Sequence, residues 1–545
     1  MTRLRSLRAS AWPLGVTALA ASWLLSGGCV GAEEAAEVEA RVGLLCPEVE
    51  APGFGVDITP ENWPMASMEL APCGQVILER ATLEGEPAGI ELVRLDGSRE
   101  ELGDIEALRF SPHGDRARWL DGFGRFVLRE LEGEGRSRVY EDSVSQSGWV
   151  GTRAGGSLSR PWVCVARNEG DFIEVFDFDE VVSFEVGSCD AGGEVRSSTV
   201  VPRMLTRDRD GNLVRLDADS GESTVLVPGS EIPEDANIWM DPLGTVASFM
   251  APAEPGGSIT RRRVYDGGGQ LVAEYPLPAS VLAVGVGERR IAIVVTESQA
   301  VAFVEVEGEL RVYPIHTGES LGISTSRTAE GGTVVLAFTD GTIVAMPDAD
   351  PERLEVIGEH IGPPTDLLVS PEGEWVAWKN TGGCLAPPDC SNRKVFVERW
   401  SVGGGRAPTL VTAAGNPEAI VIRSLFDDGA LLLRGALVAE DGSLGETFEQ
   451  ILSAGGEVVE AFPADFGTVG NLRGFWGRSA DGRLLVRTQA TPSTLDLSLL
   501  GSDGSLERIG DAQELWSAAV DGGGQRAISV SEGEARWGQL PVSVD

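Results

Sequence analysis

The sequence has little positive charge, and almost none of it comes from lysine. The chain of 545 residues has 84 acidic and 44 basic side chains, a formal net charge of −40, and only Lys379 and Lys394 are lysines. Such a surface repels phosphate backbones and anionic lipid headgroups, so we expect no nucleic-acid binding and no purely electrostatic attachment to membranes. Two lysines also leave few candidates for Schiff-base chemistry.

Other common signatures are missing as well. The three histidines, His113, His316 and His360, are far apart, so the HExxH zinc motif is absent. No Cys-x-x-Cys pair occurs, which removes the basis for a thioredoxin-like role. Amphipathic helical periodicity is nearly absent from the body of the chain, where short apolar runs and strict alternation dominate. These absences favour an all-β protein without an obvious catalytic motif.

Residues 1–28 have the layout of an export signal. Three arginines near the start precede an apolar stretch at 11–25, which is too short for a comfortable membrane span of about 20 residues. The following Leu25-Ser26-Gly27-Gly28-Cys29 run resembles the lipobox of bacterial lipoproteins, with one extra small residue. That resemblance implies cleavage before Cys29, acylation of its sulfur and membrane attachment through the lipid. The alternative is an ordinary signal peptidase site.

The resemblance also implies an address. Residue 30 is Val and not Asp, which in Gram-negative lipoproteins favours the outer membrane. The acidic, small-residue segment that follows Cys29 is typical of a tether, so we predict three parts: a signal peptide at 1–28, a tether leading into the body at 29–58, and the body at 59–545.

Cysteine numbers support an exported chain. Without Cys29, an even number of cysteines remains, which predicts disulfides in an oxidising compartment. The short, turn-rich loop between Cys384 and Cys390 favours a local bond, and proximity makes two further pairs the next candidates. These candidates are Cys384–Cys390, Cys164–Cys189 and Cys46–Cys73.

A turn-plus-strand unit recurs through the body. Each copy has an apolar stretch, a polar turn with glycine and a second apolar stretch, as in FSPHGDRARWL at 110–120 and VSPEGEWVAWK at 369–379. Spacings of about 40–50 residues are typical of four-stranded propeller blades. The gap between Gly114 and Gly244 leaves room for degenerate units near Pro161 and Met204. The turn glycines are Gly74, Gly114, Gly244, Gly287, Gly332, Gly373, Gly429, Gly482 and Gly524.

The best copies, Ser111-Pro112-His113-Gly114 and Ser370-Pro371-Glu372-Gly373, resemble the WD40-like repeat of TolB-type periplasmic propellers. That resemblance implies a β-propeller, often with a partner-binding role, and no catalytic residues. Nine glycines and two degenerate units make eleven, whereas one propeller usually has about 4–8 blades. We therefore predict an all-β propeller of four-stranded blades, as one large propeller of about seven or eight blades or as two in tandem divided near residue 280.

Two motifs suggest chemistry. Asp208, Asp210 and Asn212 alternate like the oxygen ligands of a calcium loop, although a polar hairpin turn explains them better. Gly318-Glu319-Ser320-Leu321-Gly322 matches the GxSxG pattern of serine hydrolases, which requires a following helix that this sequence does not predict. We expect no cofactor, with calcium as the one candidate.

The sequence thus predicts an outer-membrane-anchored lipoprotein whose propeller binds or scaffolds an envelope protein or cell-wall component. The alternative is a periplasmic propeller enzyme, a hydrolase or lyase with or without calcium. Which face of the membrane it occupies, and its ligand, stay open.

Overall fold

Antiparallel strands form almost all the regular structure, as the alternation of the sequence predicts. The computed structural model describes residues 52–541 except for these segments: 60–64, 81–89, 104, 113, 132–134, 141, 143, 152–158, 179, 190–194, 199–200, 234–235, 242–243, 253–257, 287–288, 307–308, 326–332, 360–363, 381–394, 402–408, 414–420, 439–443, 464–470, 513–514, 522–523 and 532–533.

In the first half of the described chain, the strands are β1 (Val56–Asp57), β2 (Met65–Leu70), β3 (Val76–Arg80), β4 (Ile90–Val93), β5 (Arg99–Gly103), β6 (Ile105–Phe110), β7 (Arg116–Asp121), β8 (Phe126–Glu130), β9 (Ser137–Tyr140), β10 (Val144–Val150), β11 (Arg160–Arg167), β12 (Gly170–Phe176), β13 (Val181–Val186), β14 (Arg196–Ser197), β15 (Arg203–Arg207), β16 (Leu213–Asp217), β17 (Ser223–Val227), β18 (Ile238–Met240), β19 (Val246–Pro252), β20 (Ile259–Asp266) and β21 (Leu271–Pro276).

In the second half, the strands are β22 (Ala279–Val286), β23 (Arg289–Thr296), β24 (Ala300–Val306), β25 (Glu309–His316), β26 (Ser320–Thr325), β27 (Val334–Phe338), β28 (Thr342–Met346), β29 (Glu355–Glu359), β30 (Pro364–Val369), β31 (Trp375–Asn380), β32 (Val395–Ser401), β33 (Thr409–Ala413), β34 (Val421–Leu425), β35 (Leu431–Val438), β36 (Leu444–Leu452), β37 (Val458–Pro463), β38 (Leu472–Arg478), β39 (Leu484–Thr491), β40 (Thr494–Leu500), β41 (Leu506–Asp511), β42 (Leu515–Val520), β43 (Arg526–Ser531) and β44 (Glu534–Gln539).

Helices are rare in the part of the chain that the structure describes. They are single 3-10 turns, η2 (Gly229–Glu231), η3 (Pro347–Ala349) and η4 (Pro351–Arg353). Within the same residues, no helix has the length and apolar character needed to cross a membrane.

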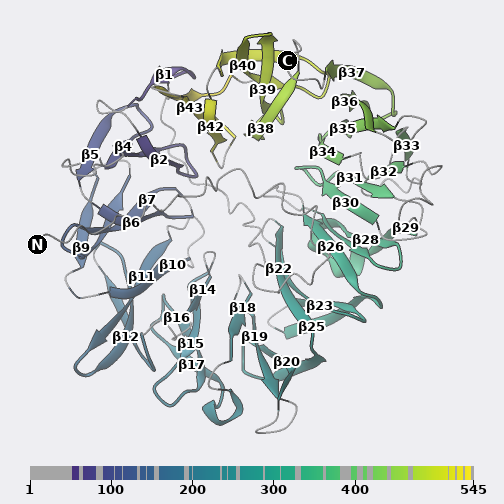
Figure 1. Cartoon of the computed structure of the whole chain (residues 1–545). Helices are drawn as coiled ribbons and strands as arrows, with labels where there is room; N and C mark the ends of the chain where they lie inside the picture. The colour runs from purple at the N-terminus through teal and green to yellow at the C-terminus, as the bar shows by residue number, and fades with distance from the viewer. Residues whose placement is uncertain are drawn as a thin grey trace, which may run out of the picture. The chain divides into compact units, whose positions relative to one another are not determined.

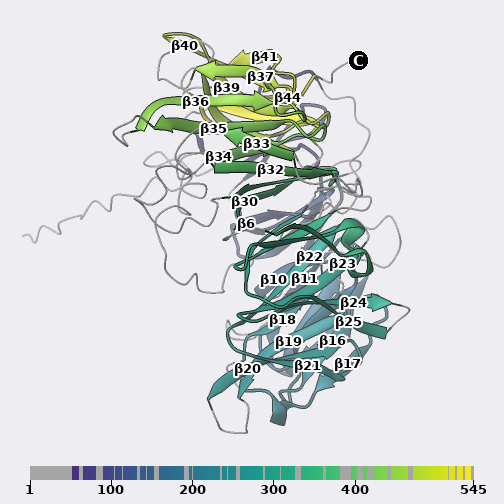
Figure 2. The same cartoon turned by 90° about the vertical axis from the view of Figure 1, so that its right-hand side faces the viewer.

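The strands form eleven four-stranded antiparallel sheets. Ten sheets each consist of four consecutive strands, and the eleventh combines β42, β43 and β44 with β1. Consecutive sheets follow one another along the chain, from purple to yellow in Figure 1. Within the β34–β37 sheet, neighbouring strands such as β35 and β36 lie side by side (Figure 2).

An apolar cluster lies at each junction between consecutive sheets. For example, Phe126, Leu128 and Val163 belong to the cluster that the β6–β9 and β10–β13 sheets share. Eleven such clusters link every sheet to the next and the last sheet to the first. The core is therefore a closed circuit of local interfaces, which is the packing of a propeller.

One hydrogen-bond pattern recurs in the turn between the first two strands of a sheet. In the β6–β7 turn, the N–H of Gly114 donates to Ser111 O and that of Ser111 donates to Arg116 O, each at 2.9 Å. The turn requires a positive φ of 73° at Gly114, which glycine adopts without strain. Positive φ values recur at the predicted turn positions inside the described residues: Gly74, Gly114, Gly244, Gly373, Gly429, Gly482 and Gly524. Gly287 and Gly332 lie outside those residues.

The circuit closes where the beginning and end of the described chain meet. Val56 of β1 pairs with Trp537 of β44 in antiparallel register. The buried Trp537 indole N–H donates to Gly74 O at 2.8 Å, and a guanidinium N–H of the buried Arg526 donates to Cys73 O at 2.8 Å. The last sheet is thereby bonded to the first turn of the β2–β5 sheet.

The predictions of seven or eight blades and of two tandem propellers are wrong. Tyr275 and Ala279 pack with Ala292 and Phe303 in one apolar cluster, so a continuous core crosses the proposed boundary near residue 280. All eleven sheets belong to one circuit. Each interface involves only neighbouring sheets, so the local packing does not limit their number.

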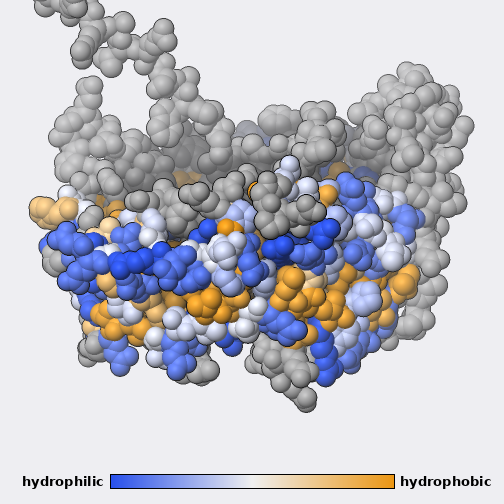
Figure 3. Space-filling model, turned by 90° about the horizontal axis from the view of Figure 1, so that it is seen from below, coloured by the Kyte–Doolittle hydropathy of each residue, from blue (hydrophilic) through white to orange (hydrophobic). Residues whose placement is uncertain are grey.

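Several aliphatic side chains on the outer strands are exposed to solvent. Hydrophilic and hydrophobic groups are interspersed on the face drawn in Figure 3. Charged neighbours on most of these fourth strands, such as Glu460 beside Val459 on β37, discourage edge-to-edge pairing. The exposed aliphatics of the fourth strands are Val139, Val181, Val225, Leu271, Val312, Val356, Val458, Val459 and Leu506.

Candidate functional site

The predicted disulfide between Cys164 and Cys189 is confirmed. The two Cα atoms are 5.4 Å apart, and both residues are buried in the cluster between the β10–β13 and β14–β17 sheets. The backbone N–H of Cys189 also donates to Asp171 at 2.6 Å. The bond therefore ties β11 to the segment that leaves the outer strand of the same sheet.

Of the other cysteines in the predictions, Cys73 alone lies within the described residues. Cys73 is buried and disulfide-bonded. Its predicted partner Cys46, the predicted pair Cys384 and Cys390, and the predicted lipidation residue Cys29 lie outside the described residues.

The predicted calcium ligands form the hairpin turn between β15 and β16. Asp208 Oδ1 accepts the backbone N–H groups of Asp210 and Asn212 at 2.9 Å each, and Asp208 Oδ2 accepts the Asn212 amide at 2.9 Å. Asn212 Oδ1 accepts the N–H of Gly229 at 2.8 Å. These bonds explain the alternating pattern as turn chemistry, and the described residues contain no group of three or more metal-ligating acidic, cysteine or histidine side chains.

The GxSxG match at 318–322 does not form a nucleophile elbow. Ser320 begins strand β26, where the hydrolase motif would need a helix, and its hydroxyl donates to Ala337 O at 3.5 Å. His316 lies nearby in sequence, and its Nε2 is 2.8 Å from Asp340 Oδ2. Burial opposes ionisation of Asp340, but hydrogen bonds from Thr342 and His316 hold its pKa below the usual range. The serine and the histidine–aspartate pair thus have separate partners.

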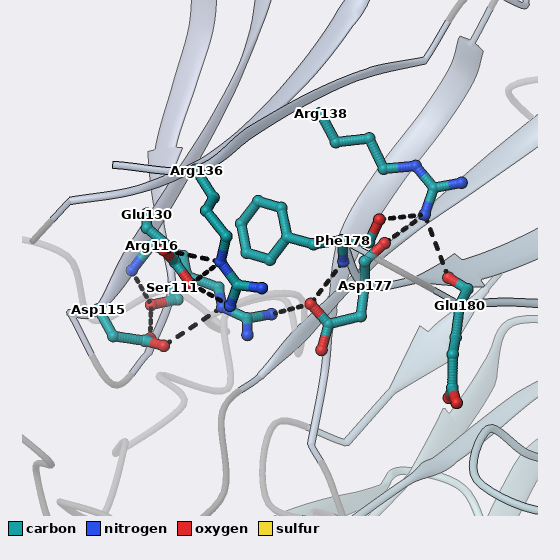
Figure 4. Close-up of polar contacts among 9 residues, drawn as sticks. All are labelled: Ser111, Asp115, Arg116, Glu130, Arg136, Arg138, Asp177, Phe178 and Glu180. Atoms are coloured by element: carbon teal, nitrogen blue, oxygen red, sulfur yellow. Dashed lines mark hydrogen bonds and ion pairs between the residues drawn. The ribbon is translucent and has the colours of Figure 1, made fainter. Parts of the chain in front are cut away.

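A charged junction that the sequence did not reveal connects two adjacent sheets. It consists of Ser111, Asp115, Arg116, Asp177 and Phe178 together with the flanking Glu130, Arg136, Arg138 and Glu180 (Figure 4). Its components come from the β6–β7 and β8–β9 turns of one sheet and the β12–β13 turn of the next.

Arg116 is the centre of this junction. Its side chain is 1% exposed, with Nε 3.4 Å from Asp115 and one Nη 3.1 Å from Asp177. Asp115 in turn accepts the hydroxyl of Ser111 at 2.7 Å. Two carboxylates thus neutralise a guanidinium that would be costly to bury alone. In most other repeats an apolar residue, such as Leu484, stands two positions after the turn glycine.

Phe178 and two further arginines complete the junction. The guanidinium carbons of Arg116 and Arg136 lie 5.1 and 4.6 Å from the centre of the Phe178 ring, distances suited to cation–π contact. Arg138 donates to the backbone oxygens of Phe178 and Glu180, both at 3.3 Å. The ion pairs, cation–π contacts and backbone hydrogen bonds of the junction hold the two sheets together.

At the hairpin between β7 and β8, the chain presents an aromatic side chain to solvent. We call residues 121–125 the Phe123 hairpin. Phe123 is 85% exposed, the highest value among the large hydrophobic residues exposed in the described chain. The Asp121 carboxylate accepts the N–H groups of Phe123 at 2.9 Å and Arg125 at 3.0 Å, and Gly124 has a φ of +74°.

Arg125 stabilises the same hairpin from its side chain. Its Nε and Nη2 donate to Asp121 Oδ2 at 2.8 and 2.6 Å, and its guanidinium carbon lies 5.1 Å from the centre of the Phe123 ring. The side-chain hydrogen bond from Arg125 and the backbone bonds lower the pKa of Asp121. The sequence signal for this exposed ring is an aromatic residue between two glycines, Gly122-Phe123-Gly124, in a hairpin turn.

Comparisons with known proteins find no matching family model and no matching curated protein. Solved structures similar to this chain include the tricorn protease (11% identity, 87% of this chain, TM-score 0.31). Others are the Dos1 propeller (8%, 80% of this chain and 93% of that one, 0.33) and AztD from Citrobacter koseri (10%, 69% and 91%, 0.28). The chain spans 57% of the tricorn protease chain. These likenesses say nothing about activity or ligand.

Proposed function

We propose that this protein is an outer-membrane lipoprotein whose propeller binds an envelope protein or a cell-wall component. The observation that carries the proposal is the Phe123 hairpin. Aromatic side chains that enter a partner's pocket dominate the binding energy of many interfaces. Phe123 is such a side chain, left in water by folding and held on a turn that its own hydrogen bonds define.

The hairpin is suited to binding because little order has to be gained when a partner arrives. Asp121 fixes the backbone on both sides of Phe123, and Arg125 lies over the ring. Pre-organised groups bind more tightly because less conformational entropy is lost on association. Rigid loops on a β scaffold are a common place for such binding residues.

Charge favours a particular kind of partner. The chain has a formal net charge of −40, so a protein surface with a basic rim around an apolar pocket complements it best. Electrostatic attraction of this kind raises the association rate and is weakened by salt.

The disulfides support an envelope address. Cys164–Cys189 is buried and Cys73 is also bonded, and such bonds persist in oxidising compartments. The predicted lipid on Cys29 supplies the anchor. We expect the mature protein in the membrane fraction to have the mass of a chain that begins at an acylated Cys29; an unlipidated, released chain would contradict the anchor.

Site-specific crosslinking in cells tests the binding surface. A photoreactive phenylalanine analogue replaces Phe123 in the full chain, and a matched control replaces Val225, which is 53% exposed on β17 of another sheet. We expect one discrete adduct from position 123 and none of the same mass from position 225. In a second chain that carries the photoreactive residue at another position, we expect the Phe123→Ala substitution to abolish the adduct with that partner. Equal adducts from both positions, or none from 123, would refute the proposal.

A further inference from the structure

Two arginines on the inner strands of the β6–β9 sheet, Arg109 and Arg118, form no ion pair with a carboxylate among the described residues. Arg109 and Arg118 are direct partners across β6 and β7, so their side chains project to the same face. Arg118 is likewise paired with Leu128, which belongs to the apolar cluster shared with the β10–β13 sheet. Both arginines therefore lie on the face toward that sheet.

Arg118 reaches across to the neighbouring inner strand β10. It donates to the hydroxyl of Ser147, and a second guanidinium nitrogen donates to Ser147 O at 3.3 Å. Its guanidinium carbon lies 5.7 Å from the centre of the Trp149 ring and 5.8 Å from that of Phe126. The charge is thus held between aromatic faces and a serine, with Arg109 beside it.

Two buried donors at this place have no acceptor within the part of the chain that the structure describes. They are Arg118 Nε and the indole N–H of Trp149, a residue that is 8% exposed. Buried donors are normally satisfied, and an orphaned pair beside a positive charge calls for an acceptor that carries negative charge. Burial and the nearby Arg109 lower the pKa of Arg118 to about 10, which leaves it protonated at neutral pH.

We propose that Arg109, Arg118, Ser147 and Trp149 form a binding site for a small carboxylate. The exposed Arg109 meets the ligand from solvent, and Arg118 and Trp149 supply the buried donors. A guanidinium offers coplanar N–H groups that match the two oxygens of a carboxylate. The site is separate from the Phe123 hairpin and does not depend on the proposed function.

The site places two positive charges side by side in a strongly acidic chain. Glu69 is the acid whose ionisation responds to Arg109: burial raises its pKa and the charge of Arg109 opposes that rise. Several buried or half-buried arginines of the described chain contact carboxylates directly, as Arg116 does, whereas others, such as Arg207, donate to backbone oxygens. Arg109 and Arg118 place two like charges next to each other beside orphaned buried donors, and a bound anion would neutralise both charges.

Ligand-dependent melting of the full chain tests the site. Succinate and acetate are titrated against sodium chloride at matched ionic strength, with Arg109→Gln as the variant. Arg311→Gln is the matched control, because Arg311 is a half-exposed arginine on β25 of another sheet. We expect a saturable rise in melting temperature with the carboxylates, a loss of apparent affinity of at least fivefold in Arg109→Gln and no change in Arg311→Gln.

A second variant addresses the buried donors. Trp149→Phe keeps an aromatic ring and removes only the indole N–H, and we expect it to weaken carboxylate binding while near-ultraviolet circular dichroism confirms the fold. No saturable effect in the native chain at matched ionic strength would overturn the proposal. Equal affinity losses in Arg109→Gln and Arg311→Gln would overturn it too, because they would mean nonspecific charge screening.

Discussion

The charged junction allows a sharp test of how a buried arginine is stabilised. Arg116 is 1% exposed and lies 3.4 Å from Asp115 and 3.1 Å from Asp177. At an effective dielectric constant of about 20, each pair attracts by about 5 kcal/mol before desolvation is subtracted. Removing the carboxylates leaves a buried cation without a counter-charge, which typically costs about 3–5 kcal/mol.

The opposite change should cost much less. Asp115 and Asp177 are 16% and 34% exposed, so water still reaches both carboxylates after Arg116→Leu. Apolar residues stand at the equivalent place in other repeats, for example Val246 and Leu484, so the leucine should find an apolar setting. Replacing a buried charge by a packed apolar side chain is often neutral, and we expect a change within about 1 kcal/mol.

Urea unfolding of three variants checks this order. The change in the free energy of unfolding is the shift in the urea midpoint multiplied by the common slope. The Asp115→Asn/Asp177→Asn variant keeps side-chain size while removing both negative charges. Arg136→Leu is the control, because Arg136 is 48% exposed and pairs with Glu130 at the surface, where such pairs contribute less than about 1 kcal/mol. If Arg116→Leu destabilises more than the double asparagine variant, the reasoning is wrong.

Three further predictions concern other elements. The Cys164→Ala/Cys189→Ala variant should lose about 3.5 kcal/mol from the loss of a 25-residue loop constraint, measured by urea unfolding against the oxidised chain. Gly114→Ala should lower stability by about 1–3 kcal/mol because φ is +73° and the new Cβ would lie 2.8 Å from the backbone nitrogen of Cys73, in the β2–β3 turn of the preceding sheet; a melting temperature equal to that of the native chain would contradict this. The pKa of Asp121 is lowered, so its contribution to stability should be full above its unfolded pKa and lost as the pH falls through the folded value. Arg125→Gln should move that loss to higher pH, as NMR titration of the carboxyl would show.

The repeating part of the fold was predictable because it depends on local chemistry. The glycines need positive φ in a fixed turn, and among the described residues they occupy that turn in seven of the eleven sheets. The degenerate units expected near Pro161 and Met204 correspond to β11 and β15, second strands of two sheets. The nine turn glycines and these two units match the eleven sheets. The predicted number of blades was wrong because it followed the usual range of about 4–8.

Features that depend on distant contacts were not predictable. β1 is a two-residue strand whose partner stands near the other end of the chain, and nothing in its local sequence reveals that pairing. Arg116 resembles a surface residue in sequence, and only the approach of Asp177 from the next sheet explains its burial.

Closure by β1 also imposes an order in time. A chain that is synthesised from its N-terminus contains Val56–Asp57 long before Glu534–Gln539 exists. The hydrogen bond from the Ala535 N–H to the Thr59 hydroxyl joins residues 476 positions apart, so it forms only when the last sheet is complete. Until then both ends of the growing stack present an uncovered apolar sheet face. The residues of β42, β43 and β44 therefore cover the last two exposed apolar faces and complete the circuit.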